Sequence, residues 1–344
     1  MKKILIIGSN HEAALENIFR NNLLKLNWSC EILPIQNIFL EFYNKSFFNK
    51  ICFRLGFTSI LKKLQGVILR EVIDFKPDIV WIFKGMEVKP VTLKKIKKYK
   101  ITLINYNPDN PFIFSSYGSG NKNITKSISL YDFHLTYDYN VKININQKYN
   151  IPCYILPFGF DDNNPFFTTN INNFEKNNEI LKLCFLGNPD KERVKFIKDV
   201  LSKNFKIDVY GYNWNKFIKH KNLKIFDPVY GNSFFEVLQK YRIQINIMRE
   251  HNRNTHNMRS FDIPGAGGIM LAPNTPDHKI YFEDNKEIFL YDDINDFTYK
   301  ANNLLQQNFE TINNYRIAAR QKSLQYTYTK ISKYISDLFI KYAI

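Results

Sequence analysis

The sequence has few cysteines and no long apolar run. Its four cysteines lie far apart and form no CxxC pair, at Cys30, Cys52, Cys153 and Cys184. This spacing argues against a disulfide framework or a zinc site and favours reduced thiols. No run of about 18 apolar residues occurs, so we expect no integral membrane protein, and the apolar segment after the first lysines is too short for a signal peptide. We therefore expect a cytoplasmic protein.

Motifs of several enzyme and nucleic-acid-binding classes are also missing. The sequence contains no DxD, HExxH, GxSxG or GxGxxG motif and no P-loop. Neither a zinc-finger spacing nor an RNP-like motif is present, so we expect no nucleic-acid partner.

Positive charge is in excess. The 344 residues carry 48 Lys and Arg against 32 Asp and Glu, a formal net charge of +16. Residues 1–160 hold 22 basic and 11 acidic residues (net +11), and residues 161–344 hold the other 26 and 21 (net +5). A compositional bias explains part of the total but not this uneven distribution. Attraction for anions beyond the average therefore lies mainly in the first half.

Apolar strands alternate with helices along the first half of the chain. Uninterrupted apolar runs are typical of strands covered on both faces of a parallel sheet. The pattern predicts strands at 3–10 (running into a turn), 30–34, 78–83, 101–106, 131–136 and 153–157, and helical segments at 12–26, 38–73 and 90–99.

A second alternation begins after an Asn-rich connection at 157–180. It predicts strands at 181–187, 206–211, 243–247, 268–272 and 288–291, and helices at 192–201, 234–241, 260–266, 295–308 and 311–340. We therefore predict an α/β protein with two Rossmann-like domains facing across a cleft, and with C-terminal helices that pack back toward the first domain. The predicted divisions are 1–158, 159–322 and a crossover helix at 323–344.

The segment 247–272 is the most specific part of the sequence. It gathers arginines and histidines in a loop between a strand and a helix, at Arg249, His251, Arg253, His256 and Arg259. Guanidinium groups and helix N-termini favour phosphate oxygens, and a carboxylate in the first helical turn can accept hydrogen bonds from a ribose diol. A solvated polar loop with a helix cap is the alternative interpretation.

This segment resembles the CgeB-like, spore-maturation-protein type of group-1 glycosyltransferases. The matching residues are Arg249, Asn252, His256, Asn257, Met258, Arg259, Phe261, Ile263, Pro264 and Gly267. The resemblance is clear over about 180–335 and looser over 1–160. It implies a GT-B fold, a nucleotide diphosphate sugar of the UDP, GDP or dTDP type as donor in the second domain, and no metal or other cofactor.

The resemblance also assigns single residues. Asp262 takes the place of the family Glu that binds the donor ribose, and Asn254 stands where the family has another acid. Gly187, Asn188 and Arg193 resemble the strand-end turn that opens the donor domain, and Gly211 to Trp214 resemble a Gly-x-x-Trp motif whose aromatic rings stack near the base. An ordinary capped turn and a core aromatic are the alternatives. The predicted donor-binding residues are Gly187, Asn188, Arg193, Gly211, Tyr212, Trp214, Arg249, His256, Asn257, Arg259, Asp262, Gly267 and Gly268.

Polar turns follow two strands of the first half. His11 follows the first strand and is a candidate proton carrier. Asp109 lies in a loop that resembles the family's Asp-Pro-Phe-type loop. Polar turns without a function are the alternative. The predicted acceptor-side residues are Gly8, Asn10, His11, Asn107 and Asp109, and the predicted catalytic residues are His11, Asp109 and Arg259.

Lysines and aromatic residues cluster in the first half. Residues 84–100 carry seven lysines against Glu87 alone, and the aromatic stretch 39–64 carries further basic residues. This composition fits a peripheral contact with anionic lipid on the inner face of the cell membrane, and it equally fits a solvated basic face.

These features together predict a metal-independent, retaining GT-B glycosyltransferase. It would move a sugar from a nucleotide diphosphate sugar to a glycan, lipid-linked or protein acceptor. Two other classes stay open: a nucleotide-sugar epimerase on the same fold, and a non-catalytic GT-B-like nucleotide-binding or structural protein.

Overall fold

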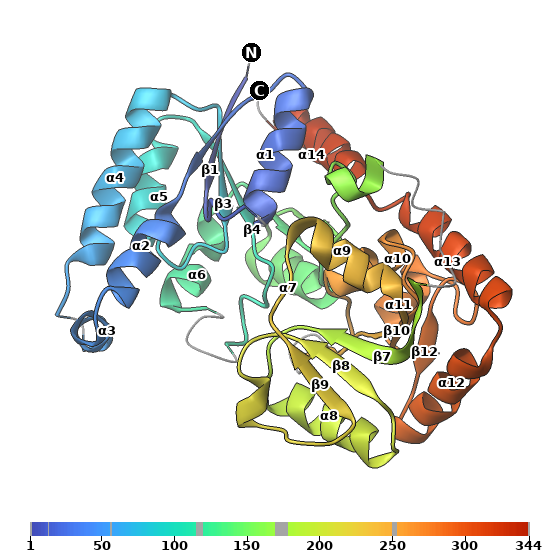
Figure 1. The fold of residues 1–344 in the computed structure, drawn as a ribbon. Coiled ribbons are helices and arrows are strands. Elements are labelled where there is room, and N and C mark those ends of the chain that lie inside the picture. The colour runs from blue at the N-terminus through green and yellow to red at the C-terminus, as the bar shows by residue number, and fades with distance from the viewer. Residues whose placement is uncertain are drawn as a thin grey trace. The chain divides into compact units, whose positions relative to one another are not determined.

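The computed structural model describes residues 2–12, 14–55, 57–114, 120–168, 178–249 and 253–342. The chain divides into two compact units. The N-terminal unit contains Met1–Pro157 together with Lys330–Ile344, and the C-terminal unit contains Phe158–Thr329 (Figure 1). The chain thus passes between the units twice, after Pro157 and after Thr329, whereas we expected boundaries after residues 158 and 322.

The N-terminal unit is built on a parallel six-stranded sheet in the order β2-β1-β3-β4-β5-β6. Its strands are β1 (Lys3–Ile7), β2 (Ser29–Leu33), β3 (Ile79–Phe83), β4 (Thr102–Tyr106), β5 (Phe133–Thr136) and β6 (Cys153–Ile155). Its helices are α1 (Leu15–Lys25), α2 (Ile35–Asn44), α3 (Phe47–Arg54), α4 (Ile60–Phe75), α5 (Pro90–Lys97), α6 (Lys122–Ser127) and α7 (Tyr139–Tyr149). All five residues of β3 are buried, as the apolar run predicts for a strand covered on both faces.

The last helix, α14 (Tyr328–Tyr342), completes the core of the N-terminal unit from Lys330 onward. The Phe339 ring lies 5.2 Å from that of Trp81, and the Trp28 Nε1 donates to the Ser336 hydroxyl at 2.8 Å. Aromatic packing of this kind buries a large apolar area and so fixes the end of the chain to the first unit.

The C-terminal unit repeats the plan with the strand order β12-β11-β10-β7-β8-β9. Its strands are β7 (Ile180–Leu186), β8 (Ile207–Tyr210), β9 (Leu223–Phe226), β10 (Tyr241–Ile245), β11 (Met270–Pro273) and β12 (Phe289–Tyr291). Its helices are α8 (Lys191–Ser202), α9 (Gly231–Lys240), α10 (Arg259–Gly265), α11 (Pro276–Tyr281), α12 (Ile294–Gln306) and α13 (Phe309–Ser323). All of these ladders are parallel. The prediction of two Rossmann-like α/β domains is confirmed.

Two details differ from the sequence-based expectation. The single helix expected at 311–340 is interrupted between α13 and α14, because Phe160 exchanges backbone hydrogen bonds with Tyr326 and Tyr328 and holds Thr327 extended. Strand β9 was not expected; it is an edge strand of only four residues, none of which is buried. In the part of the chain that the structure describes, no helix combines the length and the apolar character needed to cross a bilayer.

Candidate functional site

Each sheet has one point at which the strand order reverses, and ligands of open parallel sheets bind beyond the carboxyl ends of the strands at such a point. In the C-terminal unit the chain proceeds from β7 to β8 and β9 on one side, and then returns to place β10 on the other side of β7. The carboxyl ends of β7 and β10 therefore mark the expected ligand position in this unit. In the N-terminal unit the corresponding point lies between β1 and β3.

The turns after β7 and β8 are packed tightly together. The Asn188 Oδ1 accepts from the Tyr212 backbone N–H at 2.9 Å, and the Trp214 Nε1 donates to the Gly187 carbonyl at 2.8 Å. A Cβ atom on Gly211 would lie 2.4 Å from that same carbonyl oxygen, so this position requires glycine. The Trp214 ring is fully buried and fixes the turn, whereas the Tyr212 ring is 52% exposed.

Three arginines, Arg193, Arg249 and Arg259, follow the carboxyl ends of β7 and β10 closely enough to repel one another. Burial is the main cause that lowers the pKa of Arg193 to about 10, and repulsion by Arg249 and Arg259 adds to it, while Asp190 acts in the opposite direction. The Asp190 Oδ2 lies 3.5 Å from the Arg193 Nε and 3.4 Å from the Arg249 Nε. Arg193 and Arg249 thus share one carboxylate, which leaves net positive charge that favours a multiply charged anion.

Arg193 is positioned by the turn after β7, which carries Gly187. Asp190 caps α8 by accepting from the Arg193 backbone N–H at 2.9 Å, and the Arg193 Nη1 donates to the Asn188 carbonyl at 3.0 Å. Arg253, in contrast, is ion-paired with Glu192 at 3.0 Å and its side chain is 67% exposed. Asp190 was not among the predicted site residues, although an Asp three residues before Arg193 has the spacing of a helix cap.

Arg259 and Asp262 form a half-buried ion pair in α10. The Arg259 Nη1 donates to the Asp262 Oδ2 at 2.7 Å, and the guanidinium carbon lies 4.2 Å from the centre of the Phe234 ring. Burial raises the pKa of Asp262 to about 6, although Arg259 acts against this shift and Asp161 adds to it. The carboxylate is therefore mostly ionised at neutral pH, and its single-turn spacing from Arg259 keeps the two groups together.

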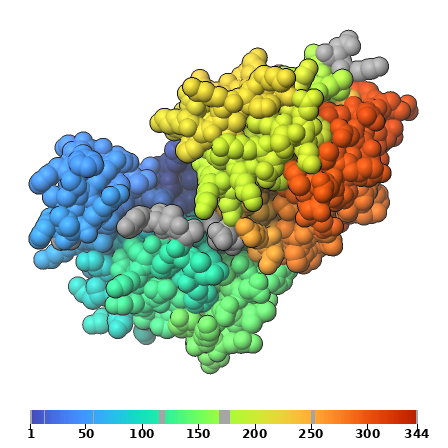
Figure 2. All heavy atoms as spheres, turned by 90° about the horizontal axis from the view of Figure 1, so that it is seen from below, coloured from blue at the N-terminus to red at the C-terminus, as the bar shows by residue number. Residues whose placement is uncertain are grey.

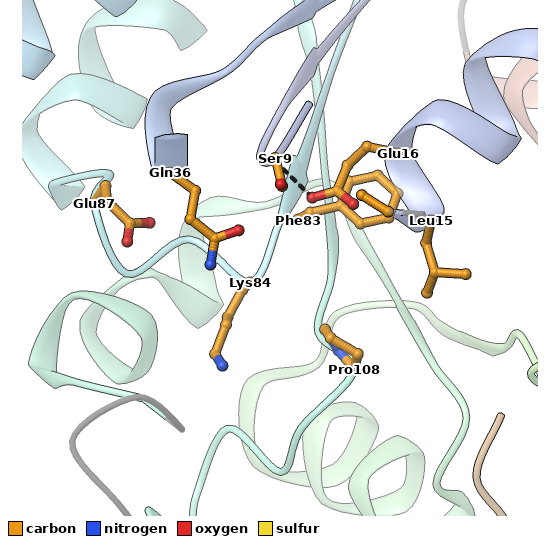
Figure 3. Close-up of a pocket in the computed structure, with 9 residues that line it drawn as sticks. Ser9, Leu15, Glu16, Gln36, Phe83, Lys84, Glu87 and Pro108 are labelled. Atoms are coloured by element: carbon orange, nitrogen blue, oxygen red, sulfur yellow. Dashed lines mark hydrogen bonds between the residues drawn. The ribbon is translucent and has the colours of Figure 1, made fainter. Parts of the chain in front are cut away.

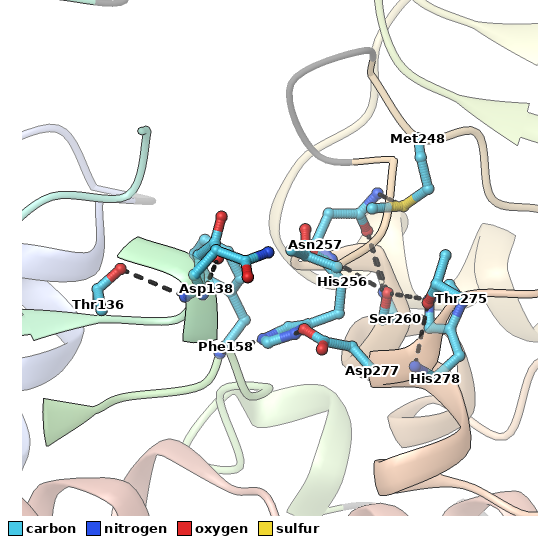
Figure 4. Close-up of polar contacts among 12 residues, drawn as sticks. Thr136, Asp138, Phe158, Met248, His256, Asn257, Ser260, Thr275, Asp277 and His278 are labelled. Atoms are coloured by element: carbon cyan, nitrogen blue, oxygen red, sulfur yellow. Dashed lines mark hydrogen bonds and ion pairs between the residues drawn. The ribbon is translucent and has the colours of Figure 1, made fainter. Parts of the chain in front are cut away.

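His256 lies inside the unit and Asn257 is half-buried, and both support the loop before α10 (Figure 4). His256 is completely buried; its Nδ1 is 2.6 Å from the Asp277 Oδ2, and its Nε2 accepts from the Phe158 backbone N–H at 3.2 Å. The Asn257 Nδ2 donates to the Asn246 Oδ1 at 2.9 Å. Both side chains are hydrogen-bonded to other residues of the unit, so they fix the loop that leads into Arg259.

His278 extends this network and gives the unit a predicted acid sensitivity. Its Nδ1 donates to the Pro273 carbonyl, its Nε2 accepts from the Ser260 hydroxyl, both at 2.8 Å, and burial lowers its pKa to about 4. The unfolded chain takes up this proton near pH 6.5, so it binds more protons than the folded state between about pH 6.5 and 4. Folding stability is therefore expected to fall by about 3 kcal/mol as the pH decreases through this range.

The substitution His278→Gln is expected to remove this part of the pH dependence. Urea midpoints of the C-terminal unit, measured near pH 7 and near pH 4.5 for wild type and variant, provide the comparison. The wild type should lose more stability on acidification than the variant. Equal losses of stability in wild type and variant would show that folding does not lower the pKa of His278.

The Gly267–Gly268 pair closes the segment. Gly267 has a φ of +75°, in the left-handed region that favours glycine. A Cβ atom on Gly268 would lie 2.7 Å from the Leu238 carbonyl oxygen. Both positions therefore require glycine for the turn that leads into β11. The matched residue Asn252 and the nearby His251 lie outside the described residues.

A pocket of about 260 Å³ lies at the switch point of the N-terminal sheet (Figure 3). Its polar lining includes Ser9, Glu16, Gln36, Lys84 and Glu87. The Glu16 Oε1 accepts from the Ser9 backbone N–H at 2.8 Å and fills the space beside Gly8, where a Cβ would lie 2.3 Å from it. Burial raises the pKa of both Glu16 and Glu87. Sequence reasoning missed both, since a Glu inside a helix or after a strand has no distinguishing pattern.

The predicted acceptor-side residues surround this pocket only in part. Asp109 forms an ion pair with the pocket residue Lys84 at 2.7 Å, and Asn107 turns the chain by accepting from the Asp109 backbone N–H at 3.0 Å. The Asn10 backbone N–H donates to the Asn37 Oδ1 at 2.9 Å, and His11 is exposed in the same loop. Neither Asn10 nor His11 lines the pocket.

Comparison with known proteins places this geometry in context. The family model described as glycosyl transferase-like matches residues 192–337, which include the three arginines, Asp262 and the glycine pair. A comparison with curated proteins finds no match.

Solved structures resemble the whole chain. Sucrose-phosphate synthase from Thermosynechococcus elongatus has a TM-score of 0.70 at 7% identity, over 99% of both chains. HepE from Anabaena in complex with UDP has a TM-score of 0.66 at 9% identity, over 99% of this chain and 100% of that one. UDP-GlcNAc 2-epimerase from Neisseria meningitidis bound to UDP-GlcNAc has a TM-score of 0.57 at 13% identity, over 99% and 100%. At such identities these likenesses establish the fold, which is GT-B. The family match makes residues 192–337 similar to glycosyl transferases.

Proposed function

We propose that the protein is a CgeB-like glycosyltransferase that moves a sugar from a nucleoside diphosphate sugar to a glycan, lipid-linked or protein acceptor. The observation that carries this proposal is the placement of Arg193 and Arg249 around Asp190, with Arg259 nearby, after the strands at the switch point of the C-terminal sheet. In the described part of the chain, these three cations pair with only two carboxylates, Asp190 and Asp262. The site therefore has positive charge available for a diphosphate.

The proposed chemistry uses this charge on the leaving group. The bond between the anomeric carbon and the diphosphate oxygen breaks, the acceptor oxygen bonds to that carbon, and the acceptor proton is released. Negative charge grows on the diphosphate, and arginines already held in place stabilise it without reorganisation. Because the sequence has no DxD motif, we propose that this stabilisation requires no metal ion. Retention of configuration and a cytoplasmic location are part of the same proposal, the former from the family resemblance.

The other donor contacts follow from the geometry of the turns. We propose that Gly187 and Asn188 face the diphosphate, that Asp262 accepts from the ribose, and that the half-exposed Tyr212 ring contacts the base. Trp214, His256 and Asn257 would act through the backbone that they support, because all three engage neighbouring groups inside the unit. Gly211, Gly267 and Gly268 would act in the same indirect way.

We propose that the acceptor binds at the N-terminal pocket. The Glu16 carboxylate already accepts the hydrogen bond of the Ser9 backbone N–H after β1. A phosphate bound at this turn would need free N–H groups, and the turn presents a carboxylate instead. This difference between the two switch points supports a donor in the C-terminal unit and a hydroxyl-bearing acceptor in the N-terminal unit. His11 and Asp109 are the proposed candidates to take the acceptor proton, with Lys84 holding the Asp109 carboxylate.

The experiment is a proton and phosphorus NMR assay with UDP-, GDP- and dTDP-sugars, each with and without simple glycan or lipid-linked acceptors. A transferase should release the nucleoside diphosphate, and an acceptor should accelerate that release. The variants Arg259→Ala and Asp262→Ala should abolish turnover and weaken nucleotide binding.

Two outcomes would replace the proposal. Interconversion of the sugar without an acceptor would indicate an epimerase, the activity named for the Neisseria structure. Nucleotide binding without turnover of any donor would indicate a non-catalytic GT-B-like protein.

A further inference from the structure

The three most exposed large apolar side chains of the described residues lie together in sequence on and after α3, with exposed Leu55 between them. Phe57, Phe47 and Phe48 are 79%, 78% and 71% exposed, and Leu55 is 63% exposed. Large apolar side chains that cluster on a surface mark interaction sites, whereas single exposed ones are ordinary.

The geometry of α3 explains how this exposure is maintained. On one side the Phe53 ring packs against Phe39 at 4.9 Å and against Tyr43 at 5.7 Å, which anchors α3 to α2. Residues 47, 51 and 55 recur every four positions and so lie along one outward face of the helix. No residue of α3 is buried. The helix is therefore apolar on both its anchored side and its solvent side.

Basic side chains surround this outward face. Residues 40–64 contain five basic residues (Lys45, Lys50, Arg54, Lys62 and Lys63) and one acidic residue, Glu41. Lys45, Lys62 and Lys63 are exposed. The segment forms one end of the N-terminal unit, where it is coloured blue in Figure 2. A second copy of the chain would bring like charges together at such a contact, which opposes self-association.

We propose that this surface, formed by α3, Phe57 and the surrounding lysines, docks the protein on an anionic lipid bilayer. Phe47, Phe48 and Phe57 would enter the boundary between headgroups and acyl chains, and the lysines would contact the lipid phosphates. This inference is independent of the proposed function, because its residues lie in the N-terminal unit and include none of the donor-binding residues. It gives the uneven basic charge of the first half a physical role.

The test is co-sedimentation of the full chain with vesicles of phosphatidylcholine alone or with about 30% phosphatidylglycerol. We expect binding to the anionic vesicles that weakens with added salt, and little binding to the neutral ones. The substitutions Phe47→Ser and Phe48→Ser together, and separately Lys62→Gln with Lys63→Gln, should each lower the partition coefficient by about tenfold. A matched control replaces two exposed apolar residues of the C-terminal unit, Ile280→Ser with Tyr299→Ser, and should leave binding unchanged.

Three results would overturn the inference. The first is no binding to anionic vesicles, and the second is equal loss of binding in the control variant. The third is a concentration-dependent dimer in analytical ultracentrifugation that the Phe47→Ser, Phe48→Ser variant abolishes, which would assign the surface to self-association. Unchanged thermal unfolding of the variants confirms that each of them remains folded.

Discussion

Replacing Arg193 by alanine is expected to raise the Kd for the preferred nucleoside diphosphate about 10- to 100-fold, because a charge-assisted hydrogen bond to phosphate is lost. Arg259→Ala should have an effect of similar size. The thermal unfolding midpoint of Arg193→Ala should stay the same or rise, since burial and repulsion from Arg249 and Arg259 disfavour the charged Arg193 in the folded protein. A residue whose removal costs binding and no stability is placed for a ligand.

Calorimetric titration with UDP, GDP and dTDP measures this effect, and Arg253→Ala is the matched control. Arg253 lies in the segment between β10 and α10 that also carries Arg249, but it pairs with Glu192 near the surface, so its removal should change the Kd by less than about threefold. Equal losses of nucleotide affinity in Arg193→Ala and Arg253→Ala would indicate that Arg193 attracts the anion only at long range and does not contact it. A lowered midpoint with unchanged Kd for Arg193→Ala would assign it a structural role.

Replacing Glu179 by alanine is expected to destabilise the C-terminal unit by about 3–5 kcal/mol, because it leaves two buried guanidinium groups without their carboxylate. Glu179 accepts from the Arg242 Nε at 2.9 Å and from the Arg316 Nη2 at 2.7 Å. The side chains of all three residues are at most 4% exposed. This cluster joins the segment before β7 to β10 and α13.

Urea unfolding measures the Glu179→Ala effect, with Glu236→Ala as the control. Glu236 forms an exposed pair with Lys240 at 3.4 Å, and its removal should change stability by less than about 0.5 kcal/mol. The Kd for nucleotide should stay close to the wild-type value in the folded Glu179 variant. A change below about 1 kcal/mol in Glu179→Ala would mean that water replaces the lost carboxylate.

The two arginine clusters of the C-terminal unit show how similar residues take different roles. Arg242 and Arg316 share Glu179, and the Arg242 Nη1 also donates to the Leu304 and Gln307 carbonyls at 3.0 and 2.8 Å. In contrast, Arg193 and Arg259 share no carboxylate: Arg193 lies beside Asp190, and Arg259 pairs with Asp262. Their Nε atoms are buried and make no hydrogen bond to any described residue, so a bound anion would find donors there.

Most of the fold could be predicted from the sequence, because apolar runs ending in glycine or polar turns specify parallel strands. β7 and β8 are of this kind, and both were expected within about a residue or two of their observed bounds. β9 and the break between α13 and α14 could not be predicted. Each depends on pairing with a distant segment, such as Phe160 with Thr327, which local patterns do not encode.

The candidate site was predictable where residue type alone suggests the chemistry. Arg193, Arg249 and Arg259 were selected for their charge, and the structure brings them together. Histidines often contact ligands, yet His256 is completely buried and pairs with Asp277, which lies 21 positions downstream. Glu16 accepts a hydrogen bond from the Ser9 backbone N–H in the turn after β1, and this contact forms only when the chain folds.

The most direct test of the central claim is a crystal structure with the nucleoside diphosphate that binds most tightly among UDP, GDP and dTDP. Our account predicts the diphosphate against Arg193, Arg249 and Arg259 beside the Gly187 turn, with the ribose at Asp262. A diphosphate bound at the Ser9 turn of the N-terminal unit, or at any site away from these arginines, would contradict it.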